Sequence, residues 1–135
     1  MRITQEADYA LRVILFLSKL GFGNKIEAKS ISESEGIPLR FLLKLLRKLK
    51  QSGIVESYRG VHGGYSLGKK PREITLKDVI ESIDGPICMN RCLYDPQACN
   101  IGRTSECEIH HAMDKIQSML LKELEDINFE QLINK

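Results

Sequence analysis

The sequence predicts a mainly α-helical fold with one small β-hairpin, and three observations support this. Residues 39–50 place leucines at steps of three and four, which lines them along one stripe of a helix. Two short segments of alternating polarity, 54–59 and 65–67, flank the glycine-rich turn 60–64, as in a hairpin. Apolar residues recur at near-heptad spacing over 109–124. Together these patterns predict a winged helix-turn-helix unit followed by a long C-terminal dimerisation helix.

Length and composition favour one domain, or one domain with an added arm. The chain has 135 residues, of which 42% are hydrophobic, and this is enough for a packed core. Residues 1–6 are polar, and Arg12 and Lys19 interrupt the apolar segment 10–20, so no secretory leader is expected. No run approaches the roughly 20 apolar residues of a membrane span. We therefore expect a soluble, cytoplasmic protein without a membrane partner.

The N-terminal third reads as two helices that lead into the leucine-rich one. Thr4 is a candidate N-cap for a helix over 4–20. A second, shorter helix is expected over 27–35 and should end at Gly36, because glycine is the usual residue after a helix C-terminus. Pro38 suits the first turn of the third helix, where its missing N–H costs nothing.

Basic residues are concentrated in the third helix and the hairpin. The net charge is only +2, but residues 36–72 contain nine basic and one acidic side chain, whereas residues 73–135 contain six and twelve. A positive field over a helix and hairpin indicates double-stranded DNA as the partner. We expect Arg40 to read guanine edges, and the hairpin tip to reach the backbone or the adjacent minor groove. The predicted phosphate contacts are Lys44, Arg47, Lys48 and Arg59. The full predicted DNA-binding set is Arg40, Phe41, Lys44, Arg47, Lys48, Arg59 and His62.

The segment after the hairpin reads as a short helix, an irregular loop and a long helix. A capping box of Thr75 and Asp78 starts a helix that Gly85-Pro86 ends. Residues 86–105 show little periodicity, and loops of this length are usually functional or disordered. A second capping box, of Ser105 and Glu108, is expected to start the long helix.

The long helix is predicted to be a dimerisation helix. Its apolar stripe consists of Ile109, Met113, Ile116, Leu120 and Leu124. A domain of this size could not easily bury the whole stripe, although the helix packing back on its own domain is the alternative. A two-fold dimer also suits a palindromic operator. Phe129, Leu132 and Ile133 then form a final short turn. The expected division is 1–85 for DNA binding, 86–105 for a cysteine-rich loop, and 106–135 for dimerisation.

Four cysteines cluster around the irregular segment, and two histidines follow them. The residues are Cys88, Cys92, Cys99, Cys107, His110 and His111. Structural disulfides are rare in cytoplasmic proteins, so these thiols are candidate metal ligands or redox-active groups. Thiolates suit zinc or the iron of iron–sulfur clusters. No CxxC pair, the common signature of structural zinc, occurs.

Several motifs resemble the Rrf-two family of bacterial transcription regulators, which includes IscR, NsrR, RirA and CymR. They are the opening Met-Arg-Ile-Thr-x-x-x-Asp-Tyr-Ala-Leu-Arg, the segment Ile-Pro-Leu-Arg-Phe-Leu, the hairpin Arg-Gly-x-x-Gly-Gly-Tyr-x-Leu-Gly, Ile-Thr-Leu-x-Asp-Val-Ile, and three spaced cysteines. The resemblance covers essentially the full chain. It implies a homodimeric winged-helix regulator whose long C-terminal helices cross, with a cluster-binding loop at the start of each.

The resemblance also implies a ligand set. Cys92, Cys99 and Cys107 match the three cysteines that hold the cluster in such regulators. The fourth ligand differs between branches: a histidine, matched by His110, implies a [2Fe–2S] cluster of the IscR type. An acidic residue from the partner subunit, matched by Asp8, implies a [4Fe–4S] cluster of the NsrR type. The sequence contains both candidate fourth ligands. The intervals between its three cysteines, of six and seven residues, exceed the usual five or so, and Cys88 is an additional thiol.

The expected function is a repressor that couples iron–sulfur, redox or nitric oxide status to operator affinity through this cluster. One alternative is a cluster-free DNA-binding regulator controlled by thiol oxidation, zinc or a partner enzyme. A redox or electron-transfer protein is a further alternative. No nucleotide-binding glycine motif, paired carboxylates or Ser/His/Asp arrangement stands out, so no enzymatic activity is expected.

Overall fold

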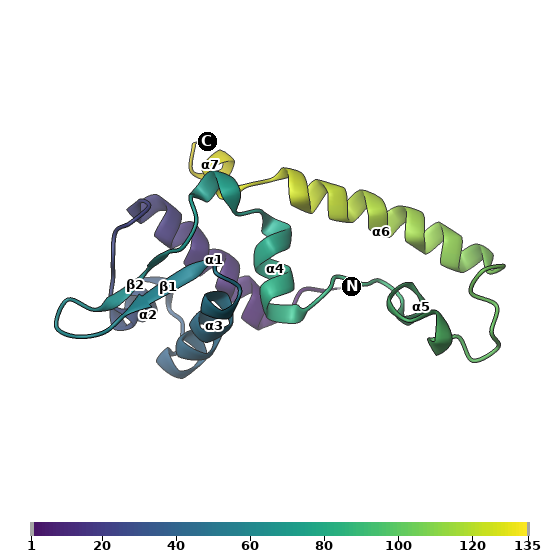
Figure 1. Cartoon of the computed structure of the whole chain (residues 1–135), viewed down its shortest axis with the longest axis horizontal. Helices are drawn as coiled ribbons and strands as arrows, with labels where there is room; N and C mark the ends of the chain where they lie inside the picture. The colour runs from purple at the N-terminus through teal and green to yellow at the C-terminus, as the bar shows by residue number, and fades with distance from the viewer. Residues whose placement is uncertain (1, 135) are drawn as a thin grey trace.

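Three helices, α1, α3 and α4, form the centre of the fold in the computed structural model, which describes residues 2–134. The remaining helices and a two-stranded hairpin surround them, and α6 extends from this body as an arm (Figure 1). The helices are α1 (Gln5–Leu20), α2 (Ala28–Glu35), α3 (Leu39–Gln51), α4 (Leu76–Asp84), α5 (Arg91–Tyr94), α6 (Glu108–Asp126) and α7 (Phe129–Ile133). Two 3₁₀ turns, η1 (Pro71–Glu73) and η2 (Pro96–Ala98), connect them. The predicted fold class, mainly helical with one small hairpin, is therefore confirmed.

Local sequence signals set the helix ends of the body. Thr4 caps α1, and its side-chain oxygen accepts a hydrogen bond from the amide of Ala7 at 3.1 Å. Gly36 follows α2 in the left-handed region at φ 65°, as expected for a C′ glycine. Thr75 and Asp78 form the predicted capping box of α4. These ends agree with the sequence prediction to within a residue or two.

The hydrophobic core lies between α1, α3 and α4 and extends to the hairpin and α7. Its side chains are apolar and almost completely buried. The largest of them are Val13, Ile14, Leu17, Ile31, Ile37, Leu42, Leu45, Leu46, Leu49, Val55, Ile74 and Phe129. Because Phe129 is 1% exposed and its amide donates to the carbonyl of Ile74, the C-terminal tail belongs to the same core as α1.

The hairpin consists of β1 (Val55–Tyr58) and β2 (Gly64–Leu67), which pair antiparallel from Val55↔Leu67 to Tyr58↔Gly64. Tyr65 also pairs with Ile26 through two backbone hydrogen bonds of 2.8 and 2.9 Å, and this fixes β2 to the turn before α2. A Cβ atom on Gly64 would lie 2.6 Å from the carbonyl oxygen of Ile26. The glycine is therefore required by close backbone approach as well as by the turn.

The arm comprises α5, η2 and α6. Residues 86–105, predicted as irregular, contain the short turns α5 and η2. The predicted capping box of Ser105 and Glu108 is wrong. Helix α6 begins at Glu108, and its N-cap is Cys107, whose sulfur accepts from the amide of His110. Within residues 2–134, no helix is both long and apolar enough to cross a membrane.

Candidate DNA interface and cysteine site

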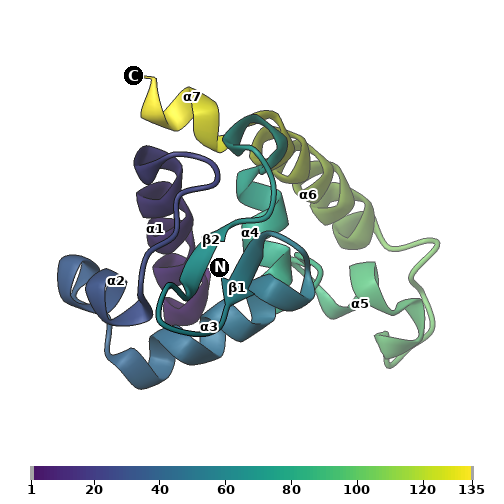
Figure 2. The same ribbon diagram turned by 60° about the vertical axis from the view of Figure 1, so that its left-hand side comes forward.

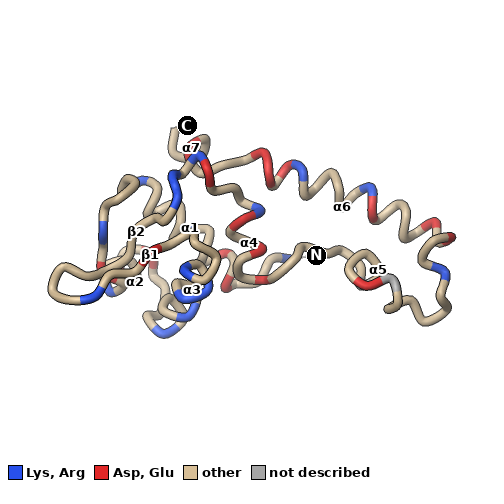
Figure 3. The backbone as a smooth tube through the Cα atoms, viewed as in Figure 1, with Lys and Arg blue, Asp and Glu red and all other residues tan. Residues whose placement is uncertain are grey.

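Helix α3 presents its basic residues on the side opposite its buried leucines. Leu42, Leu45, Leu46 and Leu49 face the core, so Arg40, Lys44 and Arg47 lie on the exposed side of the same helix. Figure 2 shows α3 lying across the body below the hairpin, and Figure 3 shows basic residues grouped along it. Among the residues described, neither Arg40, Lys44 nor Arg47 forms an ion pair with a carboxylate.

The hairpin tip provides a second exposed basic element. Arg59 and His62 are both exposed in the connecting turn, next to Val61, which is 93% exposed. Lys25, which no sequence pattern predicted as a DNA contact, lies beside this hairpin, with its ammonium 3.9 Å from the ring centroid of Tyr58. This cation–π contact holds a further positive charge next to the hairpin.

Lys48 differs from the other predicted DNA contacts because its ammonium is already bound within the body. Its Nζ lies 3.1 Å from Glu6 Oε1 on α1 and donates to the carbonyl of Ile83, in the last turn of α4, at 3.4 Å. The pair is partly buried, with side-chain exposures of 33% and 26%. In this structure Lys48 therefore joins α3 to α1 and α4, and its role as a phosphate contact stays a prediction.

The end of α4 is also fixed to α1, just before the cysteine loop begins. Asp84 accepts from both the side-chain hydroxyl and the amide of Thr4. Glu81 accepts from the amide of Ile87, at the start of the loop, at 3.2 Å. The origin of the loop is therefore attached to α4, and through α4 to α1 and α3.

Two of the three predicted cysteine ligands meet at His110. Cys92 on α5 lies with its sulfur 3.1 Å from Nδ1 of the His110 ring, and this contact joins α5 to α6. The sulfur of Cys107 accepts from the His110 amide at 3.4 Å. Cys107 thus lies at the N-terminal end of α6, where the helix dipole favours negatively charged ligands. The other histidine, His111, contacts the carbonyl of Ser105 through Nε2.

Cys99 lies apart from this pair, in the turn that follows η2. The amides of Arg103 and Ile101 face its sulfur, and with smaller contributions from Gly102 and Thr104 they lower the pKa of the Cys99 thiol. Hydrogen bonds of this kind stabilise the thiolate more than the thiol. Cys99 also lines an open hollow of about 600 Å³.

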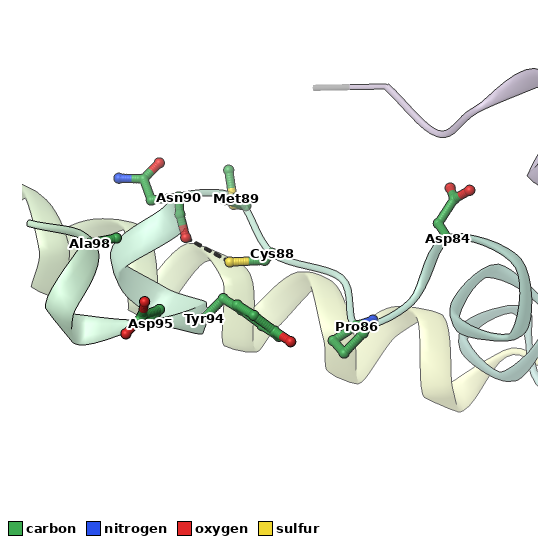
Figure 4. A pocket seen from close by; sticks show the side chains of 8 residues that line it. All are labelled: Asp84, Pro86, Cys88, Met89, Asn90, Tyr94, Asp95 and Ala98. Carbon is green, nitrogen blue, oxygen red and sulfur yellow. Dashed lines mark hydrogen bonds between the residues drawn. The ribbon is translucent and has the colours of Figure 1, made fainter.

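Cys88 forms a hydrogen bond that involves neither Cys92 nor His110. Its thiol donates to the carbonyl of Asn90, at the edge of a hollow of about 590 Å³ between the end of α4 and α5. Figure 4 shows this hydrogen bond, with Tyr94 and Asp95 from the same short segment beside it. The amide of neighbouring Met89 donates to Gln117 Oε1 on α6 at 2.7 Å, which anchors this part of the loop to the arm. No local sequence pattern predicted this contact of Gln117.

The donor set suits an iron–sulfur cluster in chemical type, since it offers three thiols and an imidazole, all only partly buried. Within the described part of the chain, however, no group of three or more potential ligands is assembled around one point. The sulfur of Cys92 contacts the His110 ring and that of Cys107 contacts the His110 backbone amide, while Cys99 lies in the turn after η2. Asp8 is exposed in the first turn of α1.

The arm exposes an apolar face. No residue described in α6 is buried, and Ile109 and Met119 are 66% and 62% exposed. Ile116 is exposed as well, whereas Met113, Leu120 and Leu124 of the predicted stripe are half-buried. Leu120 and Leu124 line a groove of about 360 Å³ together with Ile3, Ile80 and Ile87. An apolar helix face of this length is typical of a surface that a partner covers.

A basic helix below a short hairpin, on a helical body with an exposed arm, defines a winged helix-turn-helix DNA-binding regulator. The chain belongs to the Rrf2 family, described as iron-dependent transcriptional regulators, whose model matches residues 3–135. A putative HTH-type transcriptional regulator of Aquifex aeolicus is 30% identical over 99% of this chain and 92% of its own. The family and this relative are transcriptional regulators, in agreement with the prediction that the chain is not an enzyme.

Two solved structures extend the comparison. The structure of T. potens IscR aligns with a TM-score of 0.77 over 99% of this chain and 87% of that one, at 22% identity, and shares the fold. CymR (YrzC), the global cysteine regulator of B. subtilis, aligns with a TM-score of 0.73 over 98% and 95%, at 27% identity. The predicted family is confirmed by the family model, and these structures agree with it in fold.

The lowered thiol pKa of Cys99 makes its reactivity testable. Because its thiolate persists to lower pH, alkylation of Cys99 by iodoacetamide in the metal-free protein should reach half its maximal rate at lower pH than in an unfolded peptide of residues 97–105. Mass spectrometry of the Cys99 peptide across a pH series measures both rates. An equal or higher midpoint in the folded protein would show that the amides of Arg103 and Ile101 do not stabilise the thiolate.

Proposed function

We propose that this regulator is a homodimeric repressor that binds a palindromic operator and senses iron–sulfur, redox or nitric oxide status. Its sensor is an iron–sulfur cluster held by Cys92, Cys99 and Cys107, with His110 or Asp8 of the partner subunit as fourth ligand. The observation that carries the sensing role is the meeting of Cys92 and Cys107 at His110, at the N-terminal end of an exposed helix. When bound, the cluster would supply a group whose loss or modification reports the signal.

DNA binding would use the exposed face of α3 and the hairpin tip. Arg40, at the second position of α3, lies where recognition helices contact base edges, and a bidentate guanine contact suits its planar guanidinium. Lys44, Arg47 and Arg59 are exposed and free of ion pairs with the carboxylates that the structure describes, so they are available to phosphates. Phe41 and His62, both exposed, complete the proposed surface.

Dimerisation would use the exposed face of α6. Its apolar residues lie on an arm that projects from the body, and Figure 1 shows little of the body covering it. Pairing of two such helices would bury this face and relate two α3 helices by two-fold symmetry, which matches a palindromic site.

Coupling between sensor and DNA would pass through the origin of the loop. The loop begins directly after Asp84, which binds Thr4, and after Ile83, whose carbonyl binds Lys48 on α3. A bound cluster would order the loop through its ligands. The resulting shift of the first residues of the loop would then change the positions of α1 and α3 together. Lys48 is thus proposed as a positioning residue.

Substitutions in α3 should separate base reading from phosphate binding. Arg40→Ala is expected to relax sequence discrimination by about 1–3 kcal/mol, whereas Lys44→Ala should weaken all DNA equally and reduce the salt slope by about one. Lys19→Ala, which removes an exposed cation in the last turn of α1 outside the proposed DNA surface, is the matched control, and its salt slope should stay near that of wild type. Fluorescence anisotropy across a salt series measures these effects. If neither Arg40→Ala nor Lys44→Ala altered binding, α3 would not be the reading helix.

A charge on the face of α6 should dissociate the dimer. Ile116→Asp would place an unpaired carboxylate in an apolar contact, and the dimer dissociation constant should rise at least about tenfold. Ser118→Asp adds the same charge on the opposite side of α6 and should leave the constant unchanged. Sedimentation equilibrium gives both values. A monomeric wild type, or equal effects of the two substitutions, would reject α6 as the interface.

Cluster content should depend on Cys92 and not on Cys88. Anaerobically purified wild type and Cys88→Ala should contain iron and acid-labile sulfide in equal amounts and absorb visible light, while Cys92→Ala should contain neither. Cys88→Ala is the matched control because its thiol binds Asn90 outside the proposed ligands. Loss of the cluster in His110→Ala but not in Asp8→Ala would identify the fourth ligand. A colourless, iron-free wild type that still binds DNA would support the cluster-free regulator instead.

A further inference from the structure

Two leucines of α3 are exposed although the core stripe of this helix is complete. Leu39 and Leu43 are 43% and 40% exposed, whereas the four leucines of the core stripe are fully buried. They lie four residues apart, so they are neighbours on one side of the helix. Leu43 lines an open hollow of about 280 Å³ with Arg47, Ser57 and Tyr65, which places this side next to the hairpin.

These leucines lie among the basic residues of the exposed side of α3, which also carries the apolar Phe41. Leu43 is three residues after Arg40 and four before Arg47, and both spacings make neighbours on a helix. An aliphatic side chain offers no donor to a phosphate, and at this place it also adds nothing to the core. The pair instead occupies the first half of α3, which in helix-turn-helix proteins contacts base edges in the major groove.

The major groove displays one apolar group on the four ordinary base pairs, the 5-methyl group of thymine. We infer that Leu39 and Leu43 contact thymine methyl groups and so determine part of the operator sequence. The operator then carries thymine at the base pairs that face the first half of α3, beside the guanine that Arg40 reads. This inference rests on the proposed DNA-binding function and specifies the DNA that the same surface selects.

Deoxyuridine tests the inference directly, because it lacks only the methyl group and keeps the hydrogen-bonding edge of thymidine. A duplex would first be enriched from a random-sequence pool by binding to the full-length protein. It would then be resynthesised with deoxyuridine at single thymidine positions. Each contacted methyl group should contribute about fourfold in affinity, which corresponds to about 0.8 kcal/mol for one buried carbon.

Variants assign the effect to the leucines. In Leu43→Ala, the affinity ratio of the thymidine duplex to the deoxyuridine duplex should fall toward one at the positions that Leu43 contacts, and Leu39→Ala should do the same at adjacent positions. Gln51→Ala, at an exposed polar position at the end of α3, is the matched control and should leave the ratio unchanged. Because both leucines lie outside the buried core, thermal unfolding should show that the variants remain folded.

The possible outcomes distinguish failure of the thymine contact from failure of the proposed DNA-binding function. A selected duplex that binds equally well with deoxyuridine at every position would overturn the thymine contact while leaving DNA recognition intact. A thymidine preference that persists in both leucine variants would assign it to other residues and overturn the role of Leu39 and Leu43. Failure to enrich any sequence from the pool would instead reject sequence-specific DNA binding itself.

Discussion

Burial of one leucine stripe of α3 against α1 and α4 is the constraint on which the rest of the structure depends. Burying a leucine side chain contributes about 1.5–3 kcal/mol, and four of them lie along this stripe at zero exposure. Rotating α3 by a single residue, about 100°, would move charged side chains toward the core and leucines into solvent. The core therefore determines which residues of α3 lie on the exposed face that is proposed to bind DNA. The arrangement of Arg40, Lys44 and Arg47 on the outer face is a consequence of packing.

Polar contacts then refine the position that the core establishes. The pair of Lys48 with Glu6 is partly exposed, and such pairs contribute about 0–1 kcal/mol, so it orients α3 more than it stabilises the fold. The same lysine binds the carbonyl of Ile83 at the end of α4. Gly64 has a similar orienting role in the hairpin, where contact with the backbone of Ile26 holds the second strand close to the turn before α2.

Features with a local cause were predictable from the sequence, and those with a distant cause were not. Caps such as Thr4, and the leucine period of α3, act within a few residues, and the structure confirms the elements that they predict. Lys48 and Glu6 are 42 residues apart, and Cys92 and His110 are 18 apart across a segment without periodicity, so no local pattern announces these contacts. The capping box of Ser105 failed because the cysteine two residues later caps α6 instead.

The cysteine loop differs from the body because side-chain contacts, and not core burial, hold it. No residue from 86 to 107 whose burial is described is fully buried, and the arm is joined to itself by single contacts such as Met89 with Gln117 and Cys92 with His110. A segment held in this way has low local stability, which is the property required of an element that responds to a ligand. Its origin, by contrast, follows two residues that bind α1 and α3. For the proposed sensor role, this means that the loop can change its own order at little cost to the fold, while its attachment to the end of α4 links it to α3, the helix proposed to read DNA.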